Sequence, residues 1–169
     1  LRRIAGSRLE RVAVRYAKAI ELDPQFVDAY NNRGVLYHDQ GDLQQAIADY
    51  SKSIELNPQS MSSYNNRGIA YNDQGDFDKA IVDFNKAIEL DAQSAPIYYN
   101  RAAAYSNQGD LAQAIADYSK AVELDPQDAD ANNSLCWSLA LQQRAQEAMP
   151  YCEQAVALDD NASYRDSRG

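Results

Sequence analysis

The chain has 169 residues, of which 25 are acidic and 16 are basic, so its formal net charge is −9. The lysines and arginines form no cluster, which argues against nucleic acid or an anionic membrane surface as a partner. No apolar run reaches the roughly 20 residues that a membrane-spanning helix needs, and the first residues lack the apolar stretch of a signal peptide.

A repeat with a fixed step of 34 residues runs along the sequence. Segments that end in Glu-Leu-Asp, Glu-Leu-Asn or Ala-Leu-Asp recur at this step, together with a tyrosine, an arginine and a glycine. The last residues of these segments are Asp23, Asn57, Asp91, Asp125 and Asp159. A repeat of this length indicates stacked units that bury apolar surface against their neighbours, so the sequence must be interpreted one repeat at a time.

The register of the repeat divides the chain into segments. We expect a partial repeat at 1–26, with a lone helix from about residue 9, full repeats at 27–60, 61–94 and 95–128, a divergent repeat at 129–162, and the start of a truncated further repeat at 163–169. On this interpretation both ends are cuts through repeats, and the parent protein continues.

The first full repeat is predicted to begin with a helix over 27–40. Tyr30, Gly34 and Tyr37 fall on one face of such a helix, at the spacing i, i+4, i+7. Gly41 can end the helix in the left-handed conformation, which glycine adopts at low cost.

The second helix of this repeat is predicted over 43–56. Asp42 can accept backbone N–H groups as its N-cap, and Gln45 completes a capping-box pattern. Pro58 disfavours helix in the residue before it, so the helix should end near Asn57. The same signals predict helix pairs in the later repeats at 61–74 and 77–90, 95–108 and 111–124, and 129–142 and 145–158.

These repeats resemble those of the tetratricopeptide repeat family, which place aromatic, small and alanine residues and a proline at fixed positions. In the third repeat the matching residues are Tyr98, Ala102, Tyr105, Ala114, Tyr118, Ala121 and Pro126. The fourth repeat diverges but stays in register. The resemblance implies an all-α fold, a right-handed superhelical α-solenoid of helix-turn-helix repeats. It also implies a protein-protein interaction scaffold that binds a peptide or partner segment in the groove lined by the first helices.

Three arginines stand where the family usually has leucine, and each is followed by an aspartate in the same repeat. The pairs are Arg33 with Asp49, Arg67 with Asp83, and Arg101 with Asp117. The fourth repeat has Leu135 and Tyr151 instead. We infer an ion pair between the two helices of each repeat. The alternative is that both are solvated surface charges, and an exposed pair would contribute only about 0.2–1 kcal/mol.

One face of the first helices is predicted to bind the partner. Repeat positions 4, 7, 8 and 11 pack inward, so positions 6, 9 and 13 point the other way. These positions hold Asn32, Asn66 and Asn100 at position 6, Val35, Ile69, Ala103 and Trp137 at position 9, and Asp39, Asp73 and Asn107 at position 13. Trp137 is either an anchor for a partner side chain or packs on a following helix.

Asparagine donates and accepts hydrogen bonds, which suits it to bind the backbone of an extended peptide. The stripe is similar to the asparagine ladder in the superhelix of O-linked N-acetylglucosamine transferase. Alternatively, these asparagines pack against the adjacent repeat.

The carboxylate clamp of the family needs basic residues, but position 2 holds Asp28, Ser62, Pro96 and Asp130. We therefore expect basic or neutral segments to be preferred.

Cys136 and Cys152 replace the small and aromatic residues that face each other in the other repeats. They lie equally far from the turn near residue 144, so a disulfide is sterically open to them. The alternative is a reduced pair that fills apolar space. A bridge would indicate an exported or periplasmic protein, and reduced thiols a cytoplasmic one.

No pattern predicts catalysis, a cofactor or a metal site. His38 is the only histidine, and the sequence has no glycine-rich phosphate loop and no metal-ligand spacing. We expect a chain that is not an enzyme and whose partner is a protein or peptide. Two alternatives are a targeting or assembly arm of a larger enzyme and a self-association module that uses exposed repeat ends.

Pro150 should kink the last helix or delay its start.

Overall fold

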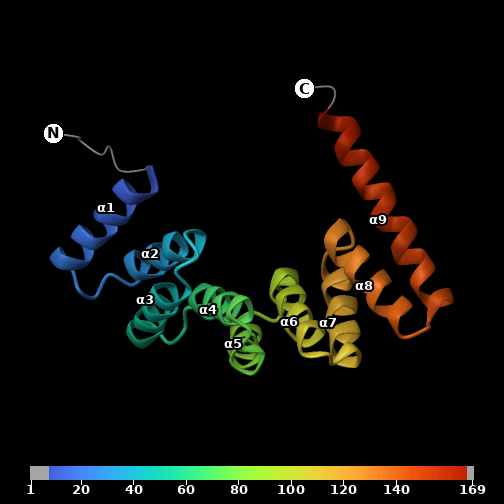
Figure 1. Ribbon diagram of the computed structural model, residues 1–169, viewed down its shortest axis with the longest axis horizontal. Helices are drawn as coiled ribbons and strands as arrows, with labels where there is room; N and C mark the ends of the chain where they lie inside the picture. The colour runs from blue at the N-terminus through green and yellow to red at the C-terminus, as the bar shows by residue number, and fades with distance from the viewer. Residues whose placement is uncertain (1–7, 167–169) are drawn as a thin grey trace. The chain divides into compact units, whose positions relative to one another are not determined.

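The computed structural model describes the backbone of residues 8–166 and the side chains of residues 11–159. That range contains nine α-helices and no β-strand (Figure 1). The helices are α1 (Arg8–Leu22), α2 (Val27–Asp39), α3 (Leu43–Leu56), α4 (Met61–Gln74), α5 (Phe77–Leu90), α6 (Ala95–Gln108), α7 (Leu111–Leu124), α8 (Ala129–Leu141) and α9 (Ala145–Asp166). None of them is both long and apolar enough to cross a lipid bilayer.

The chain divides into two compact units, an N-terminal unit of residues 1–90 with α1 to α5 and a C-terminal unit of residues 91–169 with α6 to α9. Within the units, α2 and α3, α4 and α5, α6 and α7, and α8 and α9 pack as antiparallel hairpins (Figure 1). We call the first helix of each hairpin helix A and the second helix B; α1 is a lone helix B. The predicted helix pairs are confirmed, with differences at the ends of α2, α8 and α9.

Glycine and aspartate form the turns inside the hairpins as predicted. Gly41 has a φ of +78°, and Asp42 accepts the backbone N–H of Gln45 through Oδ1 at 3.2 Å. In the fourth repeat the same turn position is held by Gln143, which takes a φ of +59° without being glycine. The left-handed turn is therefore kept even where the favoured residue is absent.

α9 extends to Asp166, beyond the expected end at residue 158. Earlier B helices end where an Asp or Asn side chain accepts the backbone N–H two residues on, as Asn57 does from Gln59 at 3.0 Å and Asp91 from Gln93 at 2.9 Å. In the fourth repeat Asp160 stands where Pro24, Pro58 and Pro126 stand in other repeats, so the proline that disfavours helix at this point is absent. Residues 163–166 are part of α9, and the rest of the expected further repeat, 167–169, lies outside the described residues. α9 starts at Ala145, so Pro150 does not delay it.

A glycine against an aromatic ring holds each of the first two hairpins together. A Cβ atom built on Gly34 would lie 2.6 Å from the Tyr50 ring, and one built on Gly68 would lie 2.7 Å from Phe84. Both rings are buried. The helices thus approach more closely than any larger residue at these positions would allow.

The predicted arginine–aspartate pairs are confirmed, and their carboxylates are buried. Arg67 donates from Nε to Asp83 Oδ2 at 2.7 Å and from Nη2 to Oδ1 at 2.8 Å, while Asp83 is only 3% exposed. The hydrogen bonds to Asp83 raise the pKa of Arg67, although partial burial opposes the rise. The solvated alternative is therefore wrong. Equivalent two-bond pairs join Arg33 to Asp49 and Arg101 to Asp117.

Candidate binding face on the A helices

A small hollow lies on the predicted binding face of the N-terminal unit. It measures about 100 Å³, and its lining residues come from α2, α3 and α4: Val35, His38, Tyr50, Asn66 and Ile69. Three of them, Val35, Asn66 and Ile69, belong to the predicted face. The structure therefore brings positions 6 and 9 of successive A helices together around one apolar depression.

Polar side chains connect α2 to α4 along this face. Asn66 donates from Nδ2 to Asn31 Oδ1 at 3.2 Å, and His38 Nε2 lies 2.8 Å from Asp73 Oδ2. In both contacts the partners are 35 residues apart, which is one repeat plus one residue. A residue of one A helix thus contacts the following A helix at the repeat position that is one residue further along.

The asparagines of position 6 differ in their surroundings. Asn32 is exposed, whereas Asn66 is partly buried and bonded to the neighbouring A helix. The alternative use, contact with the adjacent repeat, therefore occurs at Asn66. The ladder that binds a peptide remains a prediction.

Sequence reasoning missed three residues of this face. Asn31 accepts from Asn66 and also from Ser63 Oγ at 3.3 Å, Tyr50 lines the hollow, and His38 pairs with Asp73. The neighbouring Asn31 and Asn32, matched by Asn65 and Asn66 one repeat later, were the available signal. No comparable pattern marks Tyr50, because its position is aromatic for packing reasons in every hairpin but the last.

The equivalent face of the C-terminal unit is less polar. Asn100 and Ala103 on α6 are partly buried, and Asn107 is exposed. On α8, Trp137 is 66% exposed and Leu141 is also exposed. An exposed tryptophan beside an exposed leucine is a side-chain arrangement often found where a partner binds.

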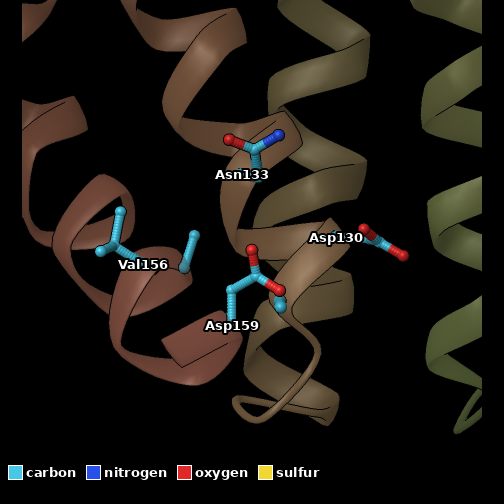
Figure 2. Close-up of a pocket in the computed structure, with 6 residues that line it drawn as sticks. Asp130, Asn133, Val156 and Asp159 are labelled. Carbon is cyan, nitrogen blue, oxygen red and sulfur yellow. The ribbon is translucent and has the colours of Figure 1, made fainter. Parts of the chain in front are cut away.

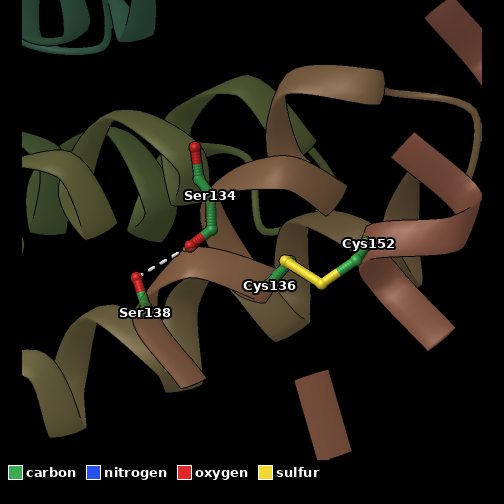
Figure 3. The surroundings of a disulfide bond; sticks show 4 residues. All are labelled: Ser134, Cys136, Ser138 and Cys152. Atoms are coloured by element: carbon green, nitrogen blue, oxygen red, sulfur yellow. Dashed lines mark hydrogen bonds between the residues drawn. A yellow bond between two sulfur atoms is a disulfide. The ribbon is translucent and has the colours of Figure 1, made fainter. Parts of the chain in front are cut away.

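A disulfide joins the two helices of the fourth repeat (Figure 3). The Cα atoms of Cys136 on α8 and Cys152 on α9 are 5.2 Å apart, and the two sulfur atoms are bonded. The bridge occupies the place where Gly34 faces Tyr50 and Gly68 faces Phe84 in earlier repeats. Two residues after Cys136, Ser138 Oγ donates to the carbonyl oxygen of Ser134 at 2.8 Å. The compartment in which the bridge forms remains a prediction.

The described residues include no group of three or more His, Cys, Asp or Glu side chains placed to hold a metal ion. His38, the residue that most resembles a catalytic candidate, contacts the Asp73 carboxylate on the next A helix. Its role in the structure is to connect two A helices.

Family models match most of the repeat array. The description "Tetratricopeptide repeat" applies to residues 27–60 and 95–128 and, in a second model, to 50–82; the description "TPR repeat" applies to residues 5–41 and 70–109. The chain belongs to the tetratricopeptide repeat family. No curated protein matches its sequence.

Solved structures agree with this assignment of the TPR fold. A crystal structure of MamA is 24% identical, with a TM-score of 0.85 over 92% of this chain and 91% of that one. MamA 41-end from Desulfovibrio magneticus RS-1 is 17% identical, with a TM-score of 0.84 over 92% and 88%. The first TPR of Spaghetti (RPAP3) bound to the HSP90 peptide SRMEEVD is 29% identical, with a TM-score of 0.69 over 72% and 96%. The chain thus has the helical solenoid fold of protein-interaction scaffolds.

Proposed function

We propose that this TPR chain binds an extended segment of a partner protein along the exposed face of its A helices. The observation that carries the proposal is the hollow between α2 and α4, because it combines an apolar floor with the amide group of Asn66. Such a combination fixes a peptide through one buried side chain and several backbone hydrogen bonds.

Val35 and Ile69 supply the apolar part of the contact. Val35 is exposed and Ile69 partly buried, so a ligand side chain can displace water from both. The hollow is small, which favours one short aliphatic side chain over a large ring.

Asn32 and Asn66 supply the polar part. Among the described contacts, Asn66 uses one amide N–H on Asn31, so its oxygen and second N–H remain for a ligand. Asn32 is exposed. Amides of this kind bind any peptide backbone, so the sequence preference must come from side chains that reach the hollow and from charge.

The charge on the face supports a basic or neutral ligand. Asp28 and Asp39 on α2 are exposed, and at physiological salt they repel acidic segments over about 8 Å. The Spaghetti TPR holds the peptide SRMEEVD, which carries three carboxylate side chains. Position 2 of the present A helices carries no basic residue, so the ligand belongs to a different class.

The test is a screen of displayed random peptides, followed by fluorescence anisotropy of the selected peptides. We expect Asn32→Ala with Asn66→Ala to weaken binding about tenfold or more, since two net hydrogen bonds of about 1 kcal/mol each are lost. Val82→Asp, at an exposed position on helix α5, is the matched control and should leave binding unchanged. Selection of acidic C-terminal peptides, or equal loss in the control, would overturn the proposal.

A further inference from the structure

Within each unit, a hairpin forms a surface on which the next A helix packs: α4 packs on α3, and α8 packs on α7. In the N-terminal unit, Ser53 Oγ on α3 lies 2.8 Å from Ser63 Oγ on α4, and Asn31 on α2 accepts from Ser63. In the C-terminal unit, Asn132 on α8 donates to the carbonyl oxygen of Pro126, and Val122 on α7 packs into the same apolar cluster as Leu135. We call this surface the helix seat.

The seat of the α8–α9 hairpin is not covered by any described residue. It forms a hollow of about 220 Å³ lined by Ala129, Asp130, Asn133, Ala155, Val156 and Asp159. Figure 2 shows Asp130 and Asn133 on the α8 side and Val156 and Asp159 on the α9 side.

Comparison of the fourth repeat with the first indicates that this seat can hold a helix. Counted by the 34-residue step, Asn133, Ala155 and Val156 stand where Asn31, Ser53 and Ile54 stand in the first repeat. Ile54 is partly buried, whereas Val156 is 62% exposed. The seat therefore leaves uncovered the apolar surface that an A helix covers elsewhere in the chain.

The charge of the seat favours a basic occupant. Asp130 and Asp159 flank its apolar floor, and both are exposed. Residues 129–159 contain four acidic residues and one basic residue.

α1 presents a surface of the complementary kind, and its basic residues do form a cluster, contrary to the expectation from the sequence. Its exposed residues Arg11, Val14, Arg15, Lys18 and Leu22 follow the spacing i, i+3, i+4, i+7, i+11 and so form one stripe. The apolar members of the stripe are unusually open, since Val14 is 67% and Leu22 is 76% exposed. With four basic and two acidic residues, α1 is positively charged in a chain of net charge −9.

We propose that α1 of one copy of this chain lies in the α8–α9 seat of a second copy. Val14 packs against Val156, and Arg11 and Arg15 approach Asp130 and Asp159. Two different surfaces meet, so the contact is heterologous and adds copies head to tail. Exposed ion pairs contribute little each, so the association is weak and falls as salt is raised. Joined copies would present several binding faces to one partner and so raise avidity.

Sedimentation velocity of the whole chain over a range of concentrations tests this contact. In low salt we expect the average mass to rise with concentration, and in high salt we expect the rise to disappear. Arg11→Glu with Arg15→Glu, or Asp130→Lys with Asp159→Lys, should each weaken association about tenfold or more, because like charges then meet. Asp28→Lys, which reverses the charge at the position of the first repeat that corresponds to Asp130, lies outside the seat and should associate as the wild type does.

Mixing the two double variants gives the decisive result. The acidic α1 of the first then matches the basic seat of the second, and the basic α1 of the second matches the acidic seat of the first. The mixture should therefore associate again in alternating copies, whereas each double variant alone does not. Val156→Glu offers a second way to block the seat if the charge variants lose helicity by circular dichroism. A wild-type chain that sediments as a monomer throughout, unchanged association in either double variant, or a mixture that stays monomeric would overturn the proposal.

Discussion

At the scale of single residues, the most consequential feature is a carboxylate buried between two helices. Asp83 accepts two hydrogen bonds from Arg67, and the guanidinium lies over the rings of Tyr64 and Tyr71 at 5.9 Å and 5.8 Å. A buried charge is costly once its partner is removed, whereas removing both partners together costs much less. The pair therefore contributes more to the choice of which helices pack together than to the free energy of unfolding.

We predict that Asp83→Ala lowers the free energy of unfolding by about 3 kcal/mol, because Arg67 loses its counter-charge while still partly buried. Replacing Arg67 by Met and Asp83 by Leu together should recover most of that loss. Glu89→Ala, which breaks the exposed ion pair with Lys86, is the control and should have little effect. Urea unfolding followed by circular dichroism measures all three, and equal effects of Asp83→Ala and Glu89→Ala would show that the carboxylate is not buried.

The close approach of Gly68 to Phe84 predicts whether Gly68→Ala raises or lowers the free energy of unfolding. In an ordinary helix interior, Gly→Ala stabilises by roughly 0.5–1 kcal/mol. Here the added Cβ would meet a buried ring at 2.7 Å, so Gly68→Ala should destabilise by about 1–3 kcal/mol. Phe84→Leu in the same chain should relieve part of the cost, as measured by urea unfolding. A stabilised Gly68→Ala variant would contradict the observed packing.

Buried tyrosines make the fold sensitive to alkali. Burial raises the pKa of Tyr118 to about 12, from 10.0 in an exposed tyrosine, and raises that of Tyr50 as well. The unfolded chain therefore loses these protons first, so this part of the stability is complete below pH 10 and is lost between pH 10 and about 12. Tyr118→Phe should make the decline in stability over that range shallower, as followed by urea unfolding at several pH values. An unchanged decline would exclude Tyr118 as a cause.

At the scale of helices, the sequence predicted most boundaries because the capping signals are local. Gly41 and Asp42 mark the turn of the first hairpin, and each does so in the structure as expected. The end of α9 was predicted wrongly because the stop of the first repeat was carried over by the 34-residue register. In the first repeat Pro58 follows Asn57, whereas in the fourth repeat Asp160 stands in the place of that proline.

The contacts between A helices were harder to predict. The sequence placed Val35, Asn66 and Ile69 on one face, and the structure groups them around one hollow. It did not indicate that Asn66 would bond to Asn31, or His38 to Asp73, because the offset of one residue beyond the repeat depends on how the helices cross. Helical periodicity defines a face, whereas the pairing across it is a property of packing.

The disulfide is predicted to stabilise the α8–α9 hairpin locally. Its 16-residue separation corresponds to about 3 kcal/mol in the chain-entropy estimate. Reduction should therefore increase hydrogen exchange in residues 129–158 first and leave residues 27–56 protected, because repeats in a linear array unfold locally.

Thiol titration of the denatured protein without reductant checks the bridge itself. No free thiol is expected if the bridge is formed in the cell, and such a bridge would indicate an exported or periplasmic protein. Two free thiols in carefully oxidised material, or exchange that is indifferent to reductant, would count against both the bridge and export.

At the scale of the whole molecule, the 34-residue repeat was enough to predict the fold from the sequence. The repeat pattern does not predict the ligand. The positions that define a TPR are packing positions such as Gly34, Tyr50 and Ala46, and these are buried. The positions proposed to contact a ligand are less buried, since Val35 is exposed and Ile69 is partly buried. For this reason the chain shares its fold with MamA and with a peptide-binding TPR at low identity.

The most direct test of a binding face on the A helices is photo-crosslinking with a selected peptide. A photoreactive phenylalanine analogue is placed at Val35 on α2 or at Val82 on α5; both are exposed, but only Val35 lines the hollow. We predict a covalent peptide adduct from position 35 and none from position 82. Adducts from position 82 alone, or equal adducts from both positions, would contradict the proposal that this TPR chain binds its partner along the A helices.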